Sequence, residues 1–194
     1  MKIILIRHGE CDSNGCYTGS GTDIPLNQLG IEQISNLKKK LSKLEGASTK
    51  LYSSSLLRAI QSAKIISNSL DINNVIFDNR LNEINFGAWE GLSYKQIMDK
   101  WPRLATAWYN NPLMATPPKG ETFNIFIKRI KGFYIDLTKD FGGETDYVII
   151  VSHGGVIQIL ATLLANETID SRWDYNIPRG NFLELDLPNI SSDN

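Results

Sequence analysis

Two histidines, His8 and His153, are the only ones in this chain of 194 residues, and either could act as a nucleophile or a base. His8 stands in the segment RHGE and His153 in the segment SHGG, so each follows an apolar run and precedes a glycine. A neutral imidazole can attack phosphorus and carry the phosphoryl group as a covalent intermediate. The first chemistry that these residues suggest is therefore phosphoryl transfer through a histidine.

Arg7 and Arg58 are the cations that we expect beside the histidines. A guanidinium group is always charged and binds phosphate with two parallel hydrogen bonds. Arg58 falls near the start of a predicted helix, whose free amides also attract anions. Two arginines and a second histidine could neutralise the phosphoryl oxygens without a metal ion, so we expect no metal ligands and no cofactor. Glu10 is expected to make structural hydrogen bonds beside this pocket.

Glu83 is the candidate for the acid that protonates the departing oxygen. It lies in the segment RLNEINFGAWEG beside Ile84 and Phe86. Apolar neighbours raise the pKa of a carboxyl group toward neutral pH, which suits a general acid. A structural alternative stays open, because Glu90 lies further along the same segment and the Glu83 carboxylate could simply bind an arginine such as Arg80.

The elements that must position these groups alternate between strand and helix. Apolar periodicity predicts strands over residues 3–6, 51–53, 147–151 and 182–187, and helices over residues 27–44, 56–70, 121–139 and 154–165. In the first helix, Ile31 belongs to the apolar stripe that should face inward. The alternation predicts an α/β three-layer sandwich with a mainly parallel central sheet. Because parallel strands bring their carboxyl ends to one sheet edge, His8 and His153 should meet there.

Residues 93–118 fit the alternation poorly, and they contain Trp101, Trp108 and Tyr109 together with four prolines. We expect a helical insertion within one domain that spans residues 1–194. The insertion is either a lid over the sheet edge, able to stack on a substrate, or a surface excursion without a role in binding.

The composition excludes several classes of protein. A net charge of -1 disfavours a general nucleic-acid binder, which normally carries a basic excess. Cys11 and Cys16 supply neither a disulfide scaffold nor a zinc site, and we expect both to be reduced. The apolar run 3–6 is too short for a signal peptide, and no run approaches the roughly 20 residues of a membrane span. We therefore expect a cytoplasmic protein, monomeric or homodimeric, without nucleic-acid or membrane partners, and with a frayed tail over residues 191–194.

Taken as an ordered set, these segments resemble the histidine phosphatase superfamily, which includes the cofactor-dependent phosphoglycerate mutases. LIRHGE is similar to the family signature, YSSSLLRAIQSA to the block with the second arginine, LNEINFGAWEGLSY to the block with the acid, and VSHGG to the block with the second histidine. The resemblance covers residues 3–187 and implies a phosphoglycerate mutase-like fold. It implies these catalytic residues: His8 as the phosphorylated nucleophile, Glu83 as the proton donor, and Arg7, Arg58 and His153 around the phosphate.

The segment after the signature, YTGSGTDIPLNQLG, also resembles the family. The resemblance implies that Asn14, Thr18 and Gly19 line the phosphate or substrate side of the pocket, together with Gly154. Within the superfamily, GTDIPLNQLG, FGAWEGLSYKQI and PPKGETF are similar to the alpha-ribazole phosphatases. That likeness implies a small-molecule phosphate ester, alpha-ribazole 5'-phosphate of cobalamin biosynthesis, as the substrate. Three alternatives stay open: a phosphoglycerate mutase, a phosphatase for phosphoserine or a sugar phosphate, and a non-catalytic phosphate-binding module.

Overall fold

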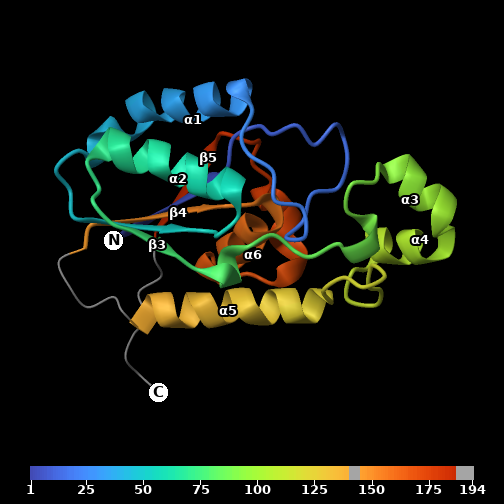
Figure 1. Cartoon of the computed structure of the whole chain (residues 1–194). Coiled ribbons are helices and arrows are strands. Elements are labelled where there is room, and N and C mark those ends of the chain that lie inside the picture. Colours follow the sequence, from blue (N-terminus) through green and yellow to red (C-terminus); the bar gives the residue numbers. More distant parts are fainter. Residues whose placement is uncertain (140–144, 187–194) are drawn as a thin grey trace, which may run out of the picture.

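The computed structural model describes residues 1–139 and 145–186, and within them a five-stranded sheet lies between two layers of helices (Figure 1). The strands are β1 (Lys2–Arg7), β2 (Thr49–Ser53), β3 (Val75–Phe77), β4 (Tyr147–Ser152) and β5 (Phe182–Asp186). Their order across the sheet is β3-β2-β4-β1-β5, and only β5 runs antiparallel to its neighbour. The predicted sandwich with a mainly parallel sheet is therefore confirmed.

The pairing of β1 with β4 sets the position of the two histidines. The two strands are parallel, from Lys2 opposite Tyr147 to Arg7 opposite Ser152. Because the next residue on each strand is a histidine, both imidazoles leave the sheet at the same level. The predicted meeting of the two HG segments at one sheet edge is confirmed.

Helices cover both faces of the sheet, as Figure 1 shows with α1 and α2 on one side and α5 and α6 on the other. The helices are α1 (Gln28–Leu41), α2 (Leu57–Leu70), α3 (Tyr94–Lys100), α4 (Pro102–Asn110), α5 (Phe123–Lys139) and α6 (Gly154–Leu164). Short 3-10 segments cover Ser42–Leu44, Asn79–Leu81, Gly87–Trp89 and Ile169–Tyr175. No helix in residues 1–139 and 145–186 is long and apolar enough to cross a membrane.

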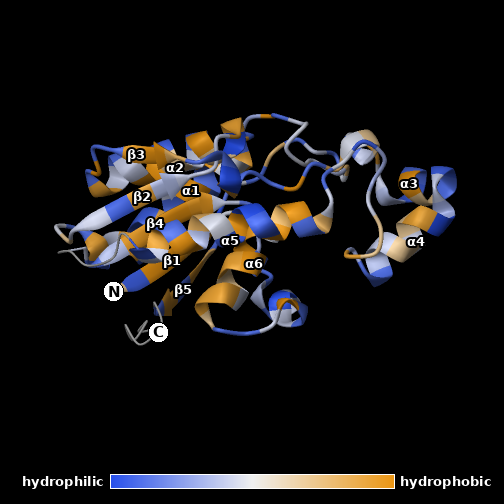
Figure 2. Cartoon of the chain, turned by 90° about the horizontal axis from the view of Figure 1, so that it is seen from below, coloured by the Kyte–Doolittle hydropathy of each residue, from blue (hydrophilic) through white to orange (hydrophobic). Residues whose placement is uncertain are grey.

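Strand alternation produces two separate apolar cores. Ile4 and Ile6 of β1 pack with α1 and α2, whereas Ile3 and Leu5 pack with α5 and α6. All four side chains are fully buried. In Figure 2 the sheet lies in the left half of the view, and the largely apolar α6 lies beside it. A strand buried on both faces reads as a continuous apolar run, which is why periodicity identified β1 and β4.

The expected inward position of Ile31 is wrong, because this side chain is 41% exposed. The inward position in the first turn of α1 belongs to Gly30, which is buried four residues before Ile34. A rotation of about 100° per residue then turns Ile31 toward solvent.

The insertion is helical, as expected. Ser93 and Gln96 form a capping box that starts α3, and Pro102 occupies the first turn of α4. Figure 1 places both helices at one end of the molecule, beyond the sheet.

The short strand β3 was not expected from the sequence. Leu187, the last residue of the expected edge strand, and the expected frayed tail lie outside the described residues.

Two glycines bring the loop after His8 against α1. A Cβ atom on Gly30 would lie 2.1 Å from the carbonyl oxygen of Glu10, and one on Gly9 would lie 2.3 Å from the carbonyl oxygen of Gly30. Real Cβ atoms do not come so close to backbone. The close approach of these two backbones therefore fixes the segment that carries the nucleophile candidate, and it requires glycine on both sides.

Replacement of Gly30 by alanine tests this contact. We expect Gly30→Ala to lower the free energy of unfolding by about 1–3 kcal/mol, because the methyl group overlaps the Glu10 backbone. The matched control is Gly132→Ala in α5, whose Cβ would meet only an Arg80 nitrogen at 3.8 Å. This control should be neutral or stabilising by up to about 1 kcal/mol, since alanine favours helix. Urea denaturation of both variants measures the difference, and equal stability of the two would refute the proposed contact.

Candidate active site

His8 follows β1 directly and is held in one protonation form. Its Nδ1 atom lies 2.7 Å from the carbonyl oxygen of Gly9. A carbonyl oxygen only accepts, so Nδ1 carries the proton and Nε2 keeps a free lone pair. The backbone N–H of His8 donates to the carbonyl of Ser152 at 3.0 Å, which ties the residue to β4. A backbone partner of this kind is what a histidine nucleophile requires.

His153 lies beside His8, with the two ring centroids 5.0 Å apart and the ring planes tilted by 60°. Its Nε2 atom is 2.8 Å from the hydroxyl oxygen of Ser54. That hydroxyl donates its own proton to Asn82 Oδ1 at 2.8 Å, so His153 Nε2 donates to Ser54. The Nδ1 atom of His153 is buried and has no partner among the described residues.

Both imidazoles are neutral at physiological pH. Burial is the main cause, and the charge of Arg58 adds to it, so that the pKa of His8 falls to about 3. Burial and the neighbouring His8 hold the pKa of His153 well below its ordinary value. The Nε2 atom of His8 is consequently unprotonated, as nucleophilic attack demands.

Arg58 lies in the first turn of α2 and is completely buried. Its guanidinium group donates to three backbone carbonyls of one loop: Thr22 at 2.9 Å, Gly19 at 3.1 Å and Thr18 at 3.4 Å. Thr18 and Gly19, predicted to line the phosphate side, therefore contact Arg58 through their backbone. Carbonyl partners orient the guanidinium group without cancelling its charge.

Arg7 is held in a similar way, because its Nη1 atom donates to the carbonyl of Ile177 at 2.8 Å. Gly154 packs against the guanidinium group, and a Cβ atom there would lie 3.1 Å from Arg7 Cζ. The Nε atoms of Arg7 and Arg58 are buried and have no partner among the described residues. A buried donor without an acceptor costs about 1–3 kcal/mol. Two such donors beside the neutral histidines form a site that an oxyanion would satisfy.

Glu83 stands between this cluster and the start of α6. Its Oε2 atom accepts from the backbone N–H of Gly155 at 3.2 Å, and Oε1 accepts from the N–H of Ile84 at 3.0 Å. Burial lowers the pKa of Arg7 and Arg58, and among nearby charges the Glu83 carboxylate opposes this shift most strongly. The Glu83 carboxylate therefore interacts electrostatically with both arginines.

Arg80, the arginine named as a structural partner for Glu83, forms its ion pairs with Asp78 and Asp136 instead. The role of Glu83 as the acid stays a prediction. Glu90 has a separate structural role, since its carboxylate accepts a hydrogen bond from the backbone N–H of Gly21 at 2.9 Å.

Asn14 is the predicted site residue that the structure places apart. Its side chain is exposed, its backbone is left-handed with φ at 49°, and none of its described contacts reaches His8 or Arg58. A role for Asn14 in binding substrate stays a prediction.

Arg179 belongs to the same charge cluster, although the sequence did not identify it. It forms an ion pair with Glu10, which confirms the structural role expected for that acid. Its charge helps to lower the pKa of His8. The N–H of Gly180 donates to the carbonyls of Arg7 and His8, so this loop encloses the nucleophile candidate. The predicted edge strand that follows Arg179 could have indicated this position, since an antiparallel β5 begins beside the end of β1.

A second group of residues holds the Glu83 segment in place. Arg129 of α5 donates to the carbonyls of Asn82 and Glu83 at 2.6 and 3.0 Å, and its charge pairs with Glu121 at 2.8 Å. The apolar periodicity of the sequence predicted that one face of α5 is buried in the core. It did not predict the polar contacts of Arg129, because periodicity identifies only apolar positions.

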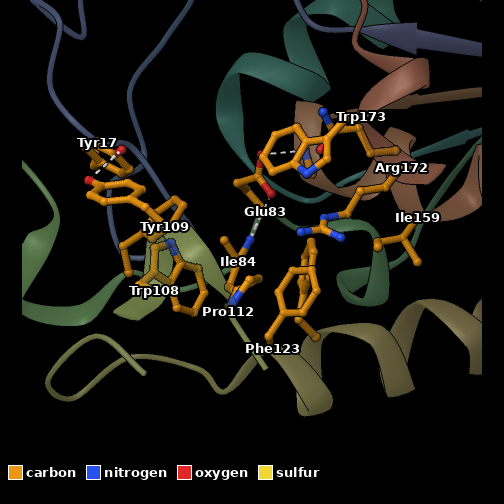
Figure 3. A pocket seen from close by; sticks show the side chains of 14 residues that line it. Tyr17, Glu83, Ile84, Trp108, Tyr109, Pro112, Phe123, Ile159, Arg172 and Trp173 are labelled. Carbon is orange, nitrogen blue, oxygen red and sulfur yellow. Dashed lines mark hydrogen bonds between the residues drawn. The ribbon is translucent and has the colours of Figure 1, made fainter. Parts of the chain in front are cut away.

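A cavity of about 300 Å³ opens beside Glu83 (Figure 3). In the view of Figure 3, Tyr17, Tyr109 and Trp108 form one wall, and Trp173, Arg172 and Ile159 form the opposite wall. Seven aromatic residues line the cavity: Tyr17, Phe86, Trp108, Tyr109, Phe123, Phe126 and Trp173. The insertion therefore contributes to the cavity through Trp108 and Tyr109, whereas Trp101 is not among the lining residues.

Comparison with known proteins places these features in a family. The family model of the histidine phosphatase superfamily (branch 1) matches residues 3–189. An adenosylcobalamin/alpha-ribazole phosphatase from Escherichia coli is 31% identical over 190 residues, which cover 96% of this chain and 90% of that protein. Phosphoserine phosphatase 1 from Hydrogenobacter thermophilus is 28% identical over 184 residues, which cover 94% of this chain and 84% of that protein.

The fold comparison agrees with the sequence comparison. The crystal structure of an alpha-ribazole phosphatase from Shigella flexneri superposes with a TM-score of 0.86 at 31% identity, covering 97% of this chain and 92% of that one. A match of this extent means that the sheet and both helix layers are shared.

The buried histidines predict a pH dependence of stability. In the folded protein the pKa of each lies far below the ordinary 6.5, so the unfolded chain binds protons below pH 6.5 that the folded chain does not. The contribution of the two neutral histidines to the free energy of unfolding is therefore fully present above pH 6.5. It decreases as the pH drops toward 3. At pH 5.5 the loss should be about 1 kcal/mol for each histidine.

Urea denaturation at pH 7.0 and 5.5 measures this loss. In His8→Gln the decrease between the two pH values should be smaller by about 1 kcal/mol, because one titrating imidazole is gone. The same decrease in wild type and variant would contradict the assignment of His8 as a buried, neutral imidazole.

Proposed function

The chain belongs to the histidine phosphatase superfamily, and from this premise we propose that it hydrolyses a small phosphate monoester, alpha-ribazole 5'-phosphate, through a phosphohistidine at His8. The observation that carries the proposal is the pair of buried, unpartnered Nε donors of Arg7 and Arg58 beside a neutral imidazole. Hydrogen bonds from guanidinium groups to phosphate oxygens are charge-assisted and therefore strong. In the proposed reaction the two guanidinium groups supply the positive charge that the transferring oxygens require.

In the first half-reaction, Nε2 of His8 attacks phosphorus and forms a P–N bond while the P–O bond to the alcohol breaks. Arg7 and Arg58 hold the non-bridging oxygens during the transfer, with the ring of His153 beside that of His8. The role of His153 in binding the phosphate stays a prediction. Glu83, protonated at this stage, gives its proton to the departing oxygen, so the product leaves as a neutral alcohol. The bond between His8 Nδ1 and Gly9 keeps the attacking nitrogen aimed at the phosphate.

In the second half-reaction, water replaces the alcohol. The Glu83 carboxylate takes a proton from the water as its oxygen attacks phosphorus, the P–N bond breaks, and inorganic phosphate forms. His8 returns to its neutral form, and Glu83 is again protonated for the next cycle. A non-catalytic phosphate-binding module would have no use for this acid beside the cluster.

The aromatic cavity favours a substrate whose alcohol part carries a flat ring. Aromatic side chains gain stacking and burial energy from such a group. Arg172 reinforces this wall, because its guanidinium group lies 5.4 Å from the ring centre of Phe123 and 4.8 Å from that of Trp173. Alpha-ribazole carries a flat dimethylbenzimidazole, whereas phosphoserine and 3-phosphoglycerate carry no ring. The cytoplasmic location and the oligomeric state stay predictions of the sequence.

A substrate panel tests the proposed function. Wild-type protein should release phosphate from alpha-ribazole 5'-phosphate with a higher kcat/KM than from phosphoserine or a sugar phosphate, and it should not interconvert 3- and 2-phosphoglycerate. His8→Ala should abolish turnover and the acid-labile phosphoenzyme, because the nucleophile is lost.

The control for this variant is Glu90→Gln, which changes a carboxylate that lies outside the proposed chemistry. It should retain the phosphoenzyme. Normal turnover by His8→Ala would end the proposal, and interconversion of the phosphoglycerates would identify a mutase instead.

Glu83→Gln tests the proton donor. The loss in kcat should be about 100-fold or more for an alkyl phosphate, whose alkoxide leaves poorly without a proton. For p-nitrophenyl phosphate the loss in the phosphorylation step should be small, since that anion leaves unaided. Burst kinetics separate phosphorylation from the water step, and an equal loss of phosphorylation rate with both esters would argue against the acid role.

A further inference from the structure

Gln158 is a polar residue of the aromatic cavity that the proposed reaction does not use. Its side chain is 9% exposed and lies on the cavity wall. Its amide makes no hydrogen bond within residues 1–139 and 145–186. The amide atoms are not among the solvent-inaccessible unpartnered groups of the described residues, so they open into the cavity. A ligand that fills the cavity displaces the water there and must then pair with this amide.

Helix α6 connects this amide to the proposed acid. Glu83 accepts from the N–H of Gly155 in the first turn of α6, and Gln158 follows three residues later. Three residues advance the helix by roughly 4.5 Å, so the backbone of Gln158 lies about one turn beyond the N–H that Glu83 binds. Both Glu83 and Gln158 line the same cavity.

The chemistry of the neighbouring polar groups narrows the choice of ligand. The hydroxyl groups of Tyr17 and Tyr109 are 2.9 Å apart and hydrogen-bond one another. Arg172 donates to the carbonyl of Ile169 at 3.0 Å. The Gln158 amide offers both a donor and an acceptor, and a neutral hydroxyl group can pair with either of them. An ester whose alcohol part is an amino acid would instead require a free carboxylate in the protein to bind its ammonium group. Glu83 is the one acid among the lining residues, and the proposed reaction already uses it.

We propose that Gln158 is a specificity-determining residue that hydrogen-bonds a hydroxyl group of a sugar directly attached to the phosphoester. The substrate class is then a phosphate ester of a ribosyl compound with a flat base, in preference to its deoxy counterpart. This inference rests on the proposed function, since it takes the phosphate end of the ligand to lie at His8. A site built to pair a hydroxyl rejects the analogue that lacks it, because the amide is then left unsatisfied.

The test measures binding apart from turnover. The affinities of alpha-ribazole 5'-phosphate and its 2',3'-dideoxy analogue are measured by titration calorimetry with His8→Ala and with the same protein carrying Gln158→Leu. In His8→Ala the dideoxy ester should bind about tenfold more weakly, the size of one net hydrogen bond. With Gln158→Leu the ratio of the two affinities should fall to about one.

Leucine has nearly the volume of glutamine and suits the apolar wall, and Gln158→Met serves as a second variant of the same kind. Equal affinities of the two esters in His8→Ala would overturn the inference. So would a tenfold ratio that survives both substitutions, or no binding of the ribosyl ester. Hydrolysis by the wild-type protein is assayed separately. Hydroxyl-dependent binding without hydrolysis would overturn the proposed function alone, and hydrolysis without hydroxyl discrimination would overturn this inference alone.

Discussion

The parallel pairing of β1 with β4 is the constraint on which the site depends. It ends with Arg7 opposite Ser152, so His8 and His153 leave the sheet at one level with ring centroids 5.0 Å apart. The apolar side chains of residues 3–6 and 148–151 are fully buried in two cores, one on each face of the sheet. A slip of one residue would exchange the two faces and separate the imidazoles, so core packing and site geometry are specified together.

Burial gives the cluster its electrostatic character. It keeps both imidazoles neutral, whereas the guanidinium groups of Arg7 and Arg58 remain charged and are oriented by backbone carbonyls instead of carboxylates. Positive charge is therefore concentrated at one sheet edge of a chain whose net charge is -1. Unpartnered buried donors reduce stability, and the same donors strengthen attraction for an anion in surroundings of low dielectric constant.

The two halves of the site come from different parts of the fold. Strand ends and the first turn of α2 provide the anion cluster, whereas the insertion, α5 and the segment around Arg172 provide the aromatic cavity. Glu83 stands at the junction, held by Gly155 of α6 and by Arg129 through the backbone.

The sequence by itself determined the elements and the histidine pair. Buried strands and amphipathic helices are local patterns, and two strands that end in HG predict one shared sheet edge for His8 and His153. Tertiary structure decided the rest. Arg179 reaches Glu10 across 169 residues because β5 runs antiparallel to β1, and the amide of Gln158 is unpaired only because the cavity forms beside it. Periodicity shows which face of an element is buried, whereas the partner of a polar group depends on which distant segments fold against it.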